Sequence, residues 1–253
     1  MVKSPPSPSR KTLAANFQTM PQTEKYKETW TGKISTKTYQ DLTFVELIVR
    51  KSTIKDSIFA DIQFKNCSLG LNTQYTNCEF SNCKFTGKYG SLGRPSEFHN
   101  CKFINCTFIG VDMFEGVDFD NCIISGRIIN AIFKDDHPNV KNSRTIFNNC
   151  DLSNLILDNV SIYGHEVFKK SILPKSGIRR FNNPNNILIN RALQICSEIK
   201  DDSKYNSEVI FNPTLKSGQD PIILDELFLN SFFTNSNSKN LFEEIVLGYE
   251  LED

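Results

Sequence analysis

The sequence lacks any surplus of charge, because 29 Lys and Arg residues are balanced by 29 Asp and Glu residues in 253 positions. A chain without net charge has no global field that would attract nucleic acid or an anionic membrane, so no direct nucleic-acid binding is expected. The sequence also lacks a run approaching the ~20 apolar residues that a transmembrane helix needs. No membrane span is therefore expected, and a protein partner of unknown identity is favoured.

Catalytic signatures are scarce as well. The chain has three histidines, which are His99, His137 and His165. His137 follows Asp135 and Asp136, a grouping that suggests acid–base chemistry, but no second histidine or Gly-Ser elbow accompanies it. The 12 glycines form no phosphate-binding loop or nucleotide fingerprint. The sequence therefore predicts no enzyme and no cofactor.

The first residues lack the apolar block of a secretory signal peptide. Residues 1–31 are rich in Pro, Ser, Thr and Lys and predict a disordered polar arm. Eight cysteines without an export signal indicate reduced thiols, and hence a cytoplasmic protein. A polar leader of this kind is also compatible with type III export. The alternative location is therefore a host cell, reached without a cleaved signal peptide.

What the sequence does contain is a repeat of five residues. Counting in fives from Ile34, with two slips and two gaps, meets a bulky apolar residue at 22 positions. These centres are Ile34, Tyr39, Phe44, Val49, Ile54, Phe59, Phe64, Leu69, Tyr75, Phe80, Phe85, Phe98, Phe103, Phe108, Met113, Phe119, Ile124, Ile129, Phe147, Leu152, Leu157 and Ile162. A period of five fits neither a helix nor a flat strand. It predicts a coil in which each pentad forms one side.

Seven of the eight cysteines stand two residues before a bulky centre, and each of the seven follows an asparagine. Residues two apart in extended backbone point to the same side, so each thiol faces inward with the following bulky side chain. Asparagine suits the bend, because it tolerates left-handed backbone and bonds nearby backbone groups. The predicted core includes Phe59, Phe64, Cys67, Leu69, Cys78, Phe80, Cys83, Phe85, Cys101, Phe103, Cys106, Phe108, Phe119, Cys122, Phe147, Cys150 and Leu152.

The cysteines are thus expected to be core packing residues rather than metal ligands, half-disulfides or nucleophiles. A zinc site would need tight Cys-x2-4-Cys pairs matched by a second pair, whereas the spacing of Cys78 to Cys83 is explained by the repeat. No metal site is predicted. Cys196, the cysteine outside the repeat, is expected to be buried on a helix.

The pentads VDMFE, VDFDN, CDLSN, CEFSN and CKFIN match the consensus of the pentapeptide-repeat family, which is a small residue, Asp or Asn, Leu or Phe, and two variable residues. The sequence resembles this family over residues 32–164. The resemblance implies a mainly β fold, a right-handed four-sided parallel β-helix with four pentads per coil. Residues 20 apart should then stack, as Ile34 on Ile54, Tyr39 on Phe59, Phe44 on Phe64 and Val49 on Leu69.

Two turn-rich gaps, at residues 86–97 and 130–144, are expected to project from this rod as loops. Their candidate interaction residues are Lys88, Tyr89, Arg94, Asp135, Asp136, His137 and Arg144. After Gly164 the repeat stops, and residues 165–253 predict a helical region with helices at 182–200, 221–233 and 238–250. This region is expected to cap the open end of the solenoid or to engage a partner, including a second copy in a homodimer.

Three functions remain open from the sequence. The first is a non-enzymatic protein-interaction module that uses the rod, its loops and its helical tail. The second is a secreted bacterial effector that binds or targets a host component, a role found among pentapeptide-repeat proteins. The third, also implied by the resemblance, is a DNA mimic that protects DNA gyrase from quinolones. Mimicry would require acidic residues to cluster, as Asp112, Glu115, Asp118 and Asp120 could, because residues 32–164 carry 14 basic and 14 acidic residues.

Overall fold

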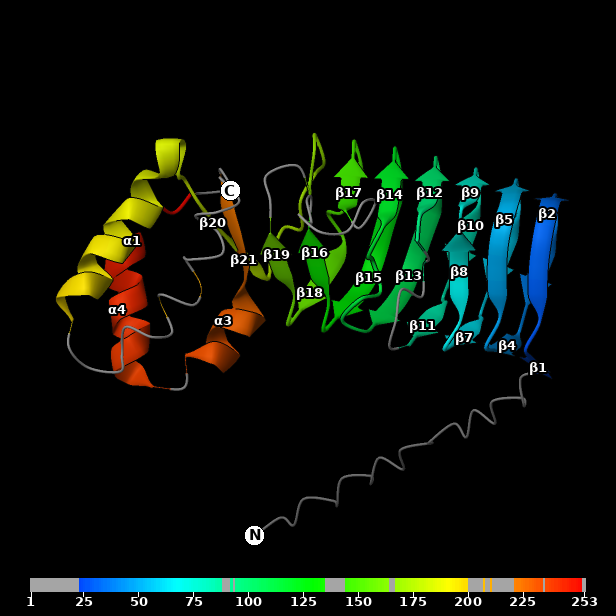
Figure 1. Ribbon diagram of the computed structural model, residues 1–253, viewed down its shortest axis with the longest axis horizontal. Coiled ribbons are helices and arrows are strands. Elements are labelled where there is room, and N and C mark those ends of the chain that lie inside the picture. Colours follow the sequence, from blue (N-terminus) through cyan, green and yellow to red (C-terminus); the bar gives the residue numbers. More distant parts are fainter. Residues whose placement is uncertain are drawn as a thin grey trace, which may run out of the picture.

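The computed structural model describes residues 23–87, 92, 94–134, 144–163, 167–199, 207, 210, 221–233 and 235–251. From Thr23 onward the chain winds into a four-sided solenoid of stacked coils, and a smaller helical unit follows at its C-terminal end (Figure 1). Strands of successive coils pair in parallel, with the register advancing by about one coil of residues at each step. This confirms the mainly β, parallel β-helical fold class.

Two sides of the coil merge into one ten-stranded sheet, because β13 and β15 run around a corner and pair with strands of both sides. Its strands are β1 Thr23–Tyr26, β3 Thr38–Gln40, β4 Leu42–Val45, β6 Ile58–Ala60, β7 Gln63–Lys65, β10 Glu79–Ser81, β11 Lys84–Thr86, β13 Lys102–Ile109, β15 Ile123–Ile129 and β18 Leu155–Asp158.

A seven-stranded sheet runs in the order β17-β14-β12-β9-β5-β2, and β8 also pairs with β5. Its strands are β2 Thr29–Ser35, β5 Ile48–Lys55, β8 Ser68–Leu71, β9 Thr73–Thr76, β12 Ser96–His99, β14 Val117–Asp120 and β17 Thr145–Asn148. The shorter strands β16 Ile132–Lys134 and β19 Ser161–Tyr163 form a separate two-stranded sheet.

Three of the predicted stacks are confirmed, because Ile34 is the register partner of Ile54, Tyr39 of Phe59 and Phe44 of Phe64. The fourth, Val49 on Leu69, falls at a register shift between β5 and β8. Aromatic rings continue these stacks as ladders through the core. One ladder has ring centroids 4.5 to 5.1 Å apart, through Tyr75, Phe98, Phe119 and Phe147. Burial of each such ring contributes about 1.5–3 kcal/mol.

The bends between pentads have left-handed backbone, as the asparagines predicted. All seven asparagines that precede a cysteine have φ between 52° and 55°. Their amides also form ladders along the corners: Asn82 Nδ2 donates to Asp61 Oδ1 at 3.1 Å, and Asn105 Nδ2 donates to Asn82 Oδ1 at 3.0 Å. Each corner therefore joins neighbouring coils through side chains as well as through backbone.

The predicted N-terminal arm is too long by nine residues. Strands β1 and β2 already belong to the first coil, in which Lys25 is the register partner of Phe44 and Trp30 that of Val49. This coil was not predicted, because Lys25 occupies an inward position where the repeat otherwise has an apolar residue. Residues 1–22 of the arm lie outside the described residues.

The second predicted loop is also too long. Strand β16 places Phe133 in the core with no exposed surface, so residues 130–134 complete a further pentad. Ile128 rather than Ile129 is the buried centre before it. The shift arises at Gly126, which has φ of +110° and lies so close to the neighbouring coil that a Cβ would be 2.0 Å from the Cys106 carbonyl oxygen.

The first gap and the end of the repeat differ from expectation too. Leu92, inside the predicted 86–97 loop, is fully buried in the solenoid core. The solenoid also continues past Gly164. Phe168 stacks on Phe147 with centroids 5.5 Å apart, and Leu152 N–H donates to the Ile172 carbonyl at 2.9 Å. Val167 and Phe168 therefore extend the core beyond the last recognisable pentad.

The C-terminal unit combines a small sheet with helices. Strand β20 Ile178–Phe181 pairs antiparallel with β21 Ile222–Asp225, and the other elements are η1 Pro184–Asn186, α1 Ile187–Glu198, α3 Glu226–Phe232 and α4 Ser236–Val246. The helix predicted at 221–233 is therefore wrong in its first five residues, 221–225. In the described part of the chain, no helix is long and apolar enough to span a membrane.

Strand β21 connects this unit to the solenoid. All four of its residues are buried. Ile223 joins the solenoid core, while Ile222 and Leu224 join the separate core of the helical unit. The buried carboxylate of Asp225 accepts a hydrogen bond from the Val160 N–H at 3.0 Å. The unit therefore covers the C-terminal end of the rod, where both apolar core and backbone groups need partners.

Candidate functional site

Both interruptions of the repeat enter the same sheet. The first is followed by β12 and the second by β17, and β14 lies between these two strands. Arg94, at the end of the first interruption, forms an ion pair with Glu115 just before β14. Arg144, at the end of the second, pairs with Asp118 in β14 at 2.9 Å. The structure thus brings the described ends of both predicted loops to one place on the rod.

Most of the predicted loop residues cannot be placed beside them. Lys88, Tyr89, Asp135, Asp136 and His137 lie outside the described residues. Arg94 and Arg144 are therefore the two candidate interaction residues that the structure positions, and both keep substantial exposure, at 41% and 56% of their side-chain area.

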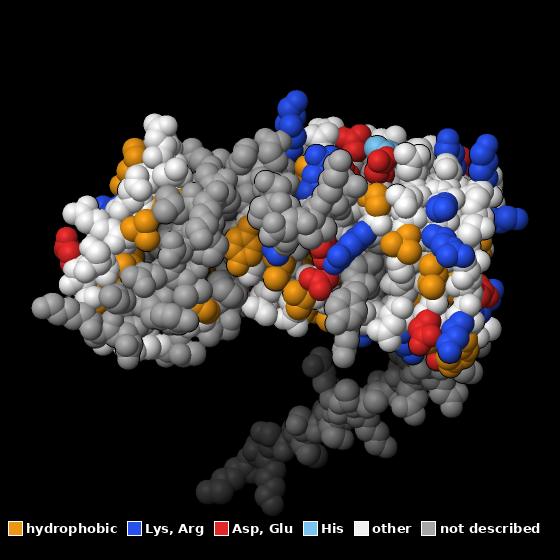
Figure 2. Space-filling model, in the orientation of Figure 1, with side chains coloured by type: hydrophobic (Ala, Val, Ile, Leu, Met, Phe, Trp, Pro, Cys, Tyr) orange, Lys and Arg blue, Asp and Glu red, His pale blue; other side chains and the backbone are white. Residues whose placement is uncertain are grey.

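A polar row crosses β9, β12, β14 and β17 next to these arginines. His99 Nε2 lies 3.2 Å from Glu97 Oε2, and His99 Nδ1 lies 3.6 Å from Asp120 Oδ2. The row is extended at its two ends by amides, since Gln74 Nε2 donates to Glu97 at 2.9 Å and Asn148 Nδ2 donates to Asp120 at 2.6 Å. Figure 2 shows acidic side chains and a histidine gathered along the upper edge of the rod.

These side chains face outward because of their place in the pentad. In β12, Phe98 points into the core, and its neighbours Glu97 and His99 point to solvent. In β14, Phe119 points into the core, and Asp118 and Asp120 point to solvent. Parallel in-register pairing then stacks the outward residues of one coil on those of the next. A row of interacting polar groups along the rod follows from the repeat itself.

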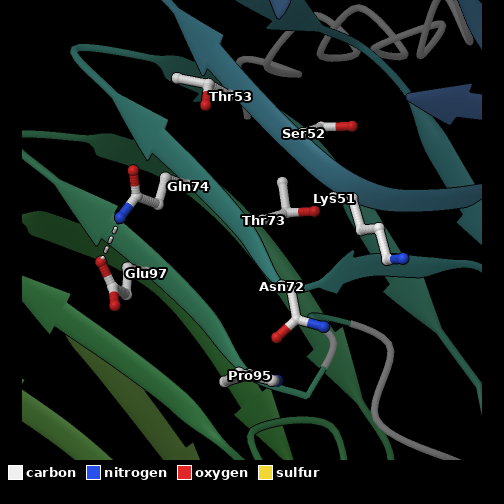
Figure 3. A pocket seen from close by; sticks show the side chains of 8 residues that line it. All are labelled: Lys51, Ser52, Thr53, Asn72, Thr73, Gln74, Pro95 and Glu97. Atoms are coloured by element: carbon white, nitrogen blue, oxygen red, sulfur yellow. Dashed lines mark hydrogen bonds between the residues drawn. The ribbon is translucent and has the colours of Figure 1, made fainter. Parts of the chain in front are cut away.

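A hollow of about 300 Å³ opens on the same side of the rod (Figure 3). It is lined by Lys51, Ser52, Thr53, Asn72, Thr73, Gln74, Pro95 and Glu97. Figure 3 shows that these residues come from neighbouring strands, with Gln74 and Glu97 joined by their hydrogen bond at one side. The lining is mostly polar, and it offers donors and acceptors for a side chain or short segment of a partner.

The hollow lies where the repeat gains a residue between Leu69 and Tyr75. Gly70 approaches the Leu92 carbonyl so closely that a Cβ would lie 2.4 Å from that oxygen. Beyond it, the Thr73 N–H donates to the Pro95 carbonyl at 3.4 Å. The extra residue turns the chain between β8 and β9, and Asn72 occupies the corner with φ of 54°. A pattern search could have indicated this place from the slip in register.

The cysteines take no part in this surface. All seventeen predicted core residues are at most 2% exposed, and all eight cysteines are buried and outside any disulfide. Thiols donate to backbone carbonyls of the preceding coil, as Cys83 Sγ does to Phe59 O at 3.2 Å and Cys106 Sγ to Phe80 O at 3.3 Å. Burial raises the pKa of the Cys67 thiol to about 11. A thiol with a raised pKa is a poor nucleophile at neutral pH.

No cluster of three or more metal-ligating side chains with suitable geometry occurs among the described residues. The His99 row places an imidazole between two carboxylates, and Thr76 of β9 is the register partner of His99. The arrangement can form hydrogen bonds and ion pairs with a partner.

A second hollow, of about 200 Å³, lies in the C-terminal unit beside Arg179, Phe233, Lys239 and Glu243. Arg179 is held there by paired hydrogen bonds to Glu243, at 2.7 and 3.0 Å, and to Glu250, at 2.7 and 2.8 Å. It links β20 to α4 and to the C-terminal residues. Four hydrogen bonds already engage its guanidinium within the unit, so this hollow is better explained as part of the stabilising framework.

From the sequence, His99 was named only as one of three histidines, and Glu97, Gln74 and Lys51 were not predicted as site residues. The row could have been predicted from the sequence spacing of residues that stack on one another in consecutive coils. Gln74, Glu97 and Asp118 occupy the same pentad position in consecutive coils, but they are separated by 23 and 21 residues rather than 20. The added residues obscured that alignment.

Comparisons with known proteins give little further information. No protein-family model matches the chain, and no curated protein matches it. The solved structure of QnrB1, described as a plasmid-mediated fluoroquinolone resistance protein, aligns with 54% of this chain and 90% of that chain, at 14% sequence identity and a TM-score of 0.26. A match of this strength assigns no function. The fold is established from the strand pairing and core packing of this chain itself.

Proposed function

Because the chain folds as a pentapeptide-repeat solenoid, we propose that it is a non-enzymatic protein-interaction module. Its binding surface is the loop-bearing face, defined by the outward residues of β9, β12, β14 and β17 together with Arg94 and Arg144. The observation that carries the proposal is the convergence of the ends of both interruptions on β14. Loops displayed on a rigid scaffold are a common way to build a recognition surface.

The charges of the face indicate a polar partner surface. Exposed carboxylates of Glu97 and Asp120 stand beside the two arginines, so the face offers both signs of charge within one coil step. Mixed charges of this kind favour specificity and register over raw affinity. The polar hollow next to Pro95 adds a recess for a partner side chain.

The gyrase-protecting alternative finds less support. DNA mimicry needs unpaired acidic residues in rows, whereas Glu115 and Asp118 are each neutralised by an arginine. A supercoiling assay with gyrase and a fluoroquinolone tests this alternative, and we expect no protection at micromolar protein. The effector alternative depends on residues 1–22, and fusion of residues 1–50 to a translocation reporter tests it.

Quantitative affinity purification from cells of the source organism tests the main proposal. Three baits are compared: the wild-type chain, a face variant carrying Glu97→Lys and Asp120→Lys, and a control carrying Glu79→Lys. Glu79 is an outward residue of β10 in the other large sheet. A specific partner should be recovered with the wild type and the control, and lost with the face variant. Equal recovery with all three baits would refute this surface.

A further inference from the structure

Among the described residues, none covers the core at the first coil of the rod. The inward side chains of Trp30, Ile34 and Tyr39 are only partly buried, whereas those of Phe44 and Val49 in the following pentads are 0% and 1% exposed. Trp30 stacks on Tyr39 with centroids 4.9 Å apart, so an aromatic pair forms this end of the core. At the opposite end, β21 contributes Ile223 to the solenoid core and covers it.

The first coil also ends in unpaired backbone. Among the described strands β2 has β5 as its single neighbour, and it is the last strand of its sheet. The Thr36 N–H donates to the Lys55 carbonyl at 3.1 Å, toward β5. Because backbone groups of alternate residues point to opposite sides of a strand, those of Lys33 and Ser35 point to the free side. An edge of this kind is a template for another strand.

The side chains along this edge favour acidic residues in the added strand. Lys33 and Lys37 are exposed, and neither has a carboxylate within ion-pair distance among the described residues. Other lysines of the first coil do have one: Lys25 Nζ is 3.6 Å from Glu28, and Lys27 Nζ is 3.9 Å from Glu46. Two cations therefore flank the free edge, and neither has a counter-ion among the residues that the structure describes.

Strand β14 of the same sheet shows which sequence would fit. Its Phe119 is directed inward and stacks on Phe98 at 5.1 Å, while Asp118 and Asp120 point outward on either side. A strand with this pattern, laid on β2 in the parallel register of the solenoid, would place its aromatic ring over Ile34. One of its carboxylates would then lie beside Lys33.

We propose that the free edge of β2 binds an extended segment of a partner protein in which an apolar residue lies between two acidic residues. The segment adds a parallel strand to the seven-stranded sheet and covers the open end of the core. This site lies at the opposite end of the sheet from β14 and β17, so it is a second interaction site and does not depend on the loop-bearing face.

The test uses the full chain and a fluorescent, terminally blocked peptide containing Gly-Val-Asp-Phe-Asp-Asn, the sequence of residues 116–121. Binding is followed by fluorescence anisotropy at low salt. A peptide with both aspartates replaced by lysine serves as the control, and we expect it to bind roughly tenfold more weakly because its charges repel Lys33 and Lys37. Equal binding of the two peptides would overturn the assigned chemistry.

Two variants separate the backbone edge from the side chains. Ser35→Pro removes an N–H on the free side while leaving the bonds to β5 intact, and proline is tolerated on edge strands for this reason. Ser35→Ala keeps that N–H. We expect binding to fall at least about tenfold in Ser35→Pro and to stay unchanged in Ser35→Ala.

If Ser35→Pro does not fold, Lys33→Glu takes its place, and its charge reversal should weaken binding of the acidic peptide. Wild-type affinity in a folded Ser35→Pro or in Lys33→Glu would overturn the proposal. So would binding that appears only when residues 1–22 are removed, because the edge would then belong to the chain's own N-terminal arm.

Discussion

Arg144 Nη2 lies 2.9 Å from Asp118 Oδ2, and this ion pair fixes the end of the second interruption against β14. Its side chains are 56% and 35% exposed. An ion pair in this setting contributes little to stability, because solvent screens it. The ion pair instead acts by position, because it holds the end of the second interruption against β14, the neighbour of the strand that follows the first interruption.

Removal of this ion pair should weaken partner binding while leaving the stability of the fold nearly unchanged. We expect Arg144→Ala to change the free energy of unfolding by less than about 1 kcal/mol. Partner recovery should nevertheless fall several-fold, because the end of the interruption loses its anchor. Urea denaturation and quantitative affinity purification measure the two effects. A large loss of stability with intact binding would show that the pair is structural only.

The thiols of the folded protein should not react with thiol reagents. Since all eight cysteines are buried and outside any disulfide, Ellman's reagent at pH 8 should react only as fast as the chain unfolds, and all eight should react in denaturant. A zinc chelator should leave the melting temperature unchanged, because the thiols act as packing groups. A fast-reacting thiol, or a chelator-dependent melting temperature, would contradict this assignment.

The corner asparagines should resist replacement for two distinct reasons. Asn82 has φ of 52° and is joined by side-chain amide bonds to Asp61 and Asn105. Asn82→Ala should lose both the amide bonds and the tolerance of left-handed backbone, at a cost of about 1–2 kcal/mol for the backbone alone. Asn82→Gly should recover the backbone part and remain less stable than the wild type. Equal stability of the two variants would contradict the role of backbone conformation.

The C-terminal unit should weaken in acid through Glu250. Hydrogen bonds from Arg179 lower the pKa of the Glu250 carboxyl below its ordinary value of 4.5. A carboxyl whose pKa is lower in the folded state stabilises the fold above its unfolded pKa, and this contribution disappears as the pH falls through the folded pKa. We therefore expect the Arg179 clamp to lose strength below about pH 4.5.

Glu250→Gln provides the control, because it removes the titrating group and keeps a hydrogen-bond acceptor. Chemical denaturation followed across pH 3 to 7 should show a shallower acid decline for this variant than for the wild type. Identical declines would mean that other groups govern the acid response.

The interior of the rod was predictable because its rules are local. A five-residue period, a small residue two places before each centre and asparagine at the bend are enough to specify inward and outward sides. Trp30 and Lys25 escaped prediction, because an end coil does not need to repeat the interior pattern. Ile129 was predicted in place of Ile128, since the bulge at Gly126 depends on close approach to another coil.

The candidate surface was predictable only in part. Arg94 and Arg144 stand out as charged residues beside strand starts, but the insertion lengths alone do not show that both pair with the same strand region. That relationship depends on which side of the coil each interruption leaves. Ile222 to Leu224 illustrate the same limit, because an apolar run of that length fits a helix or a buried strand equally well.

The most direct test of the account is hydrogen exchange of the chain with and without a partner recovered by the affinity experiment. If the loop-bearing face is the binding surface, amides at the outward positions of β12, β14 and β17 should become protected, and those of β6 and β10 in the other sheet should not change. Protection confined to β6 and β10, or to helices α1 and α4, would contradict the account.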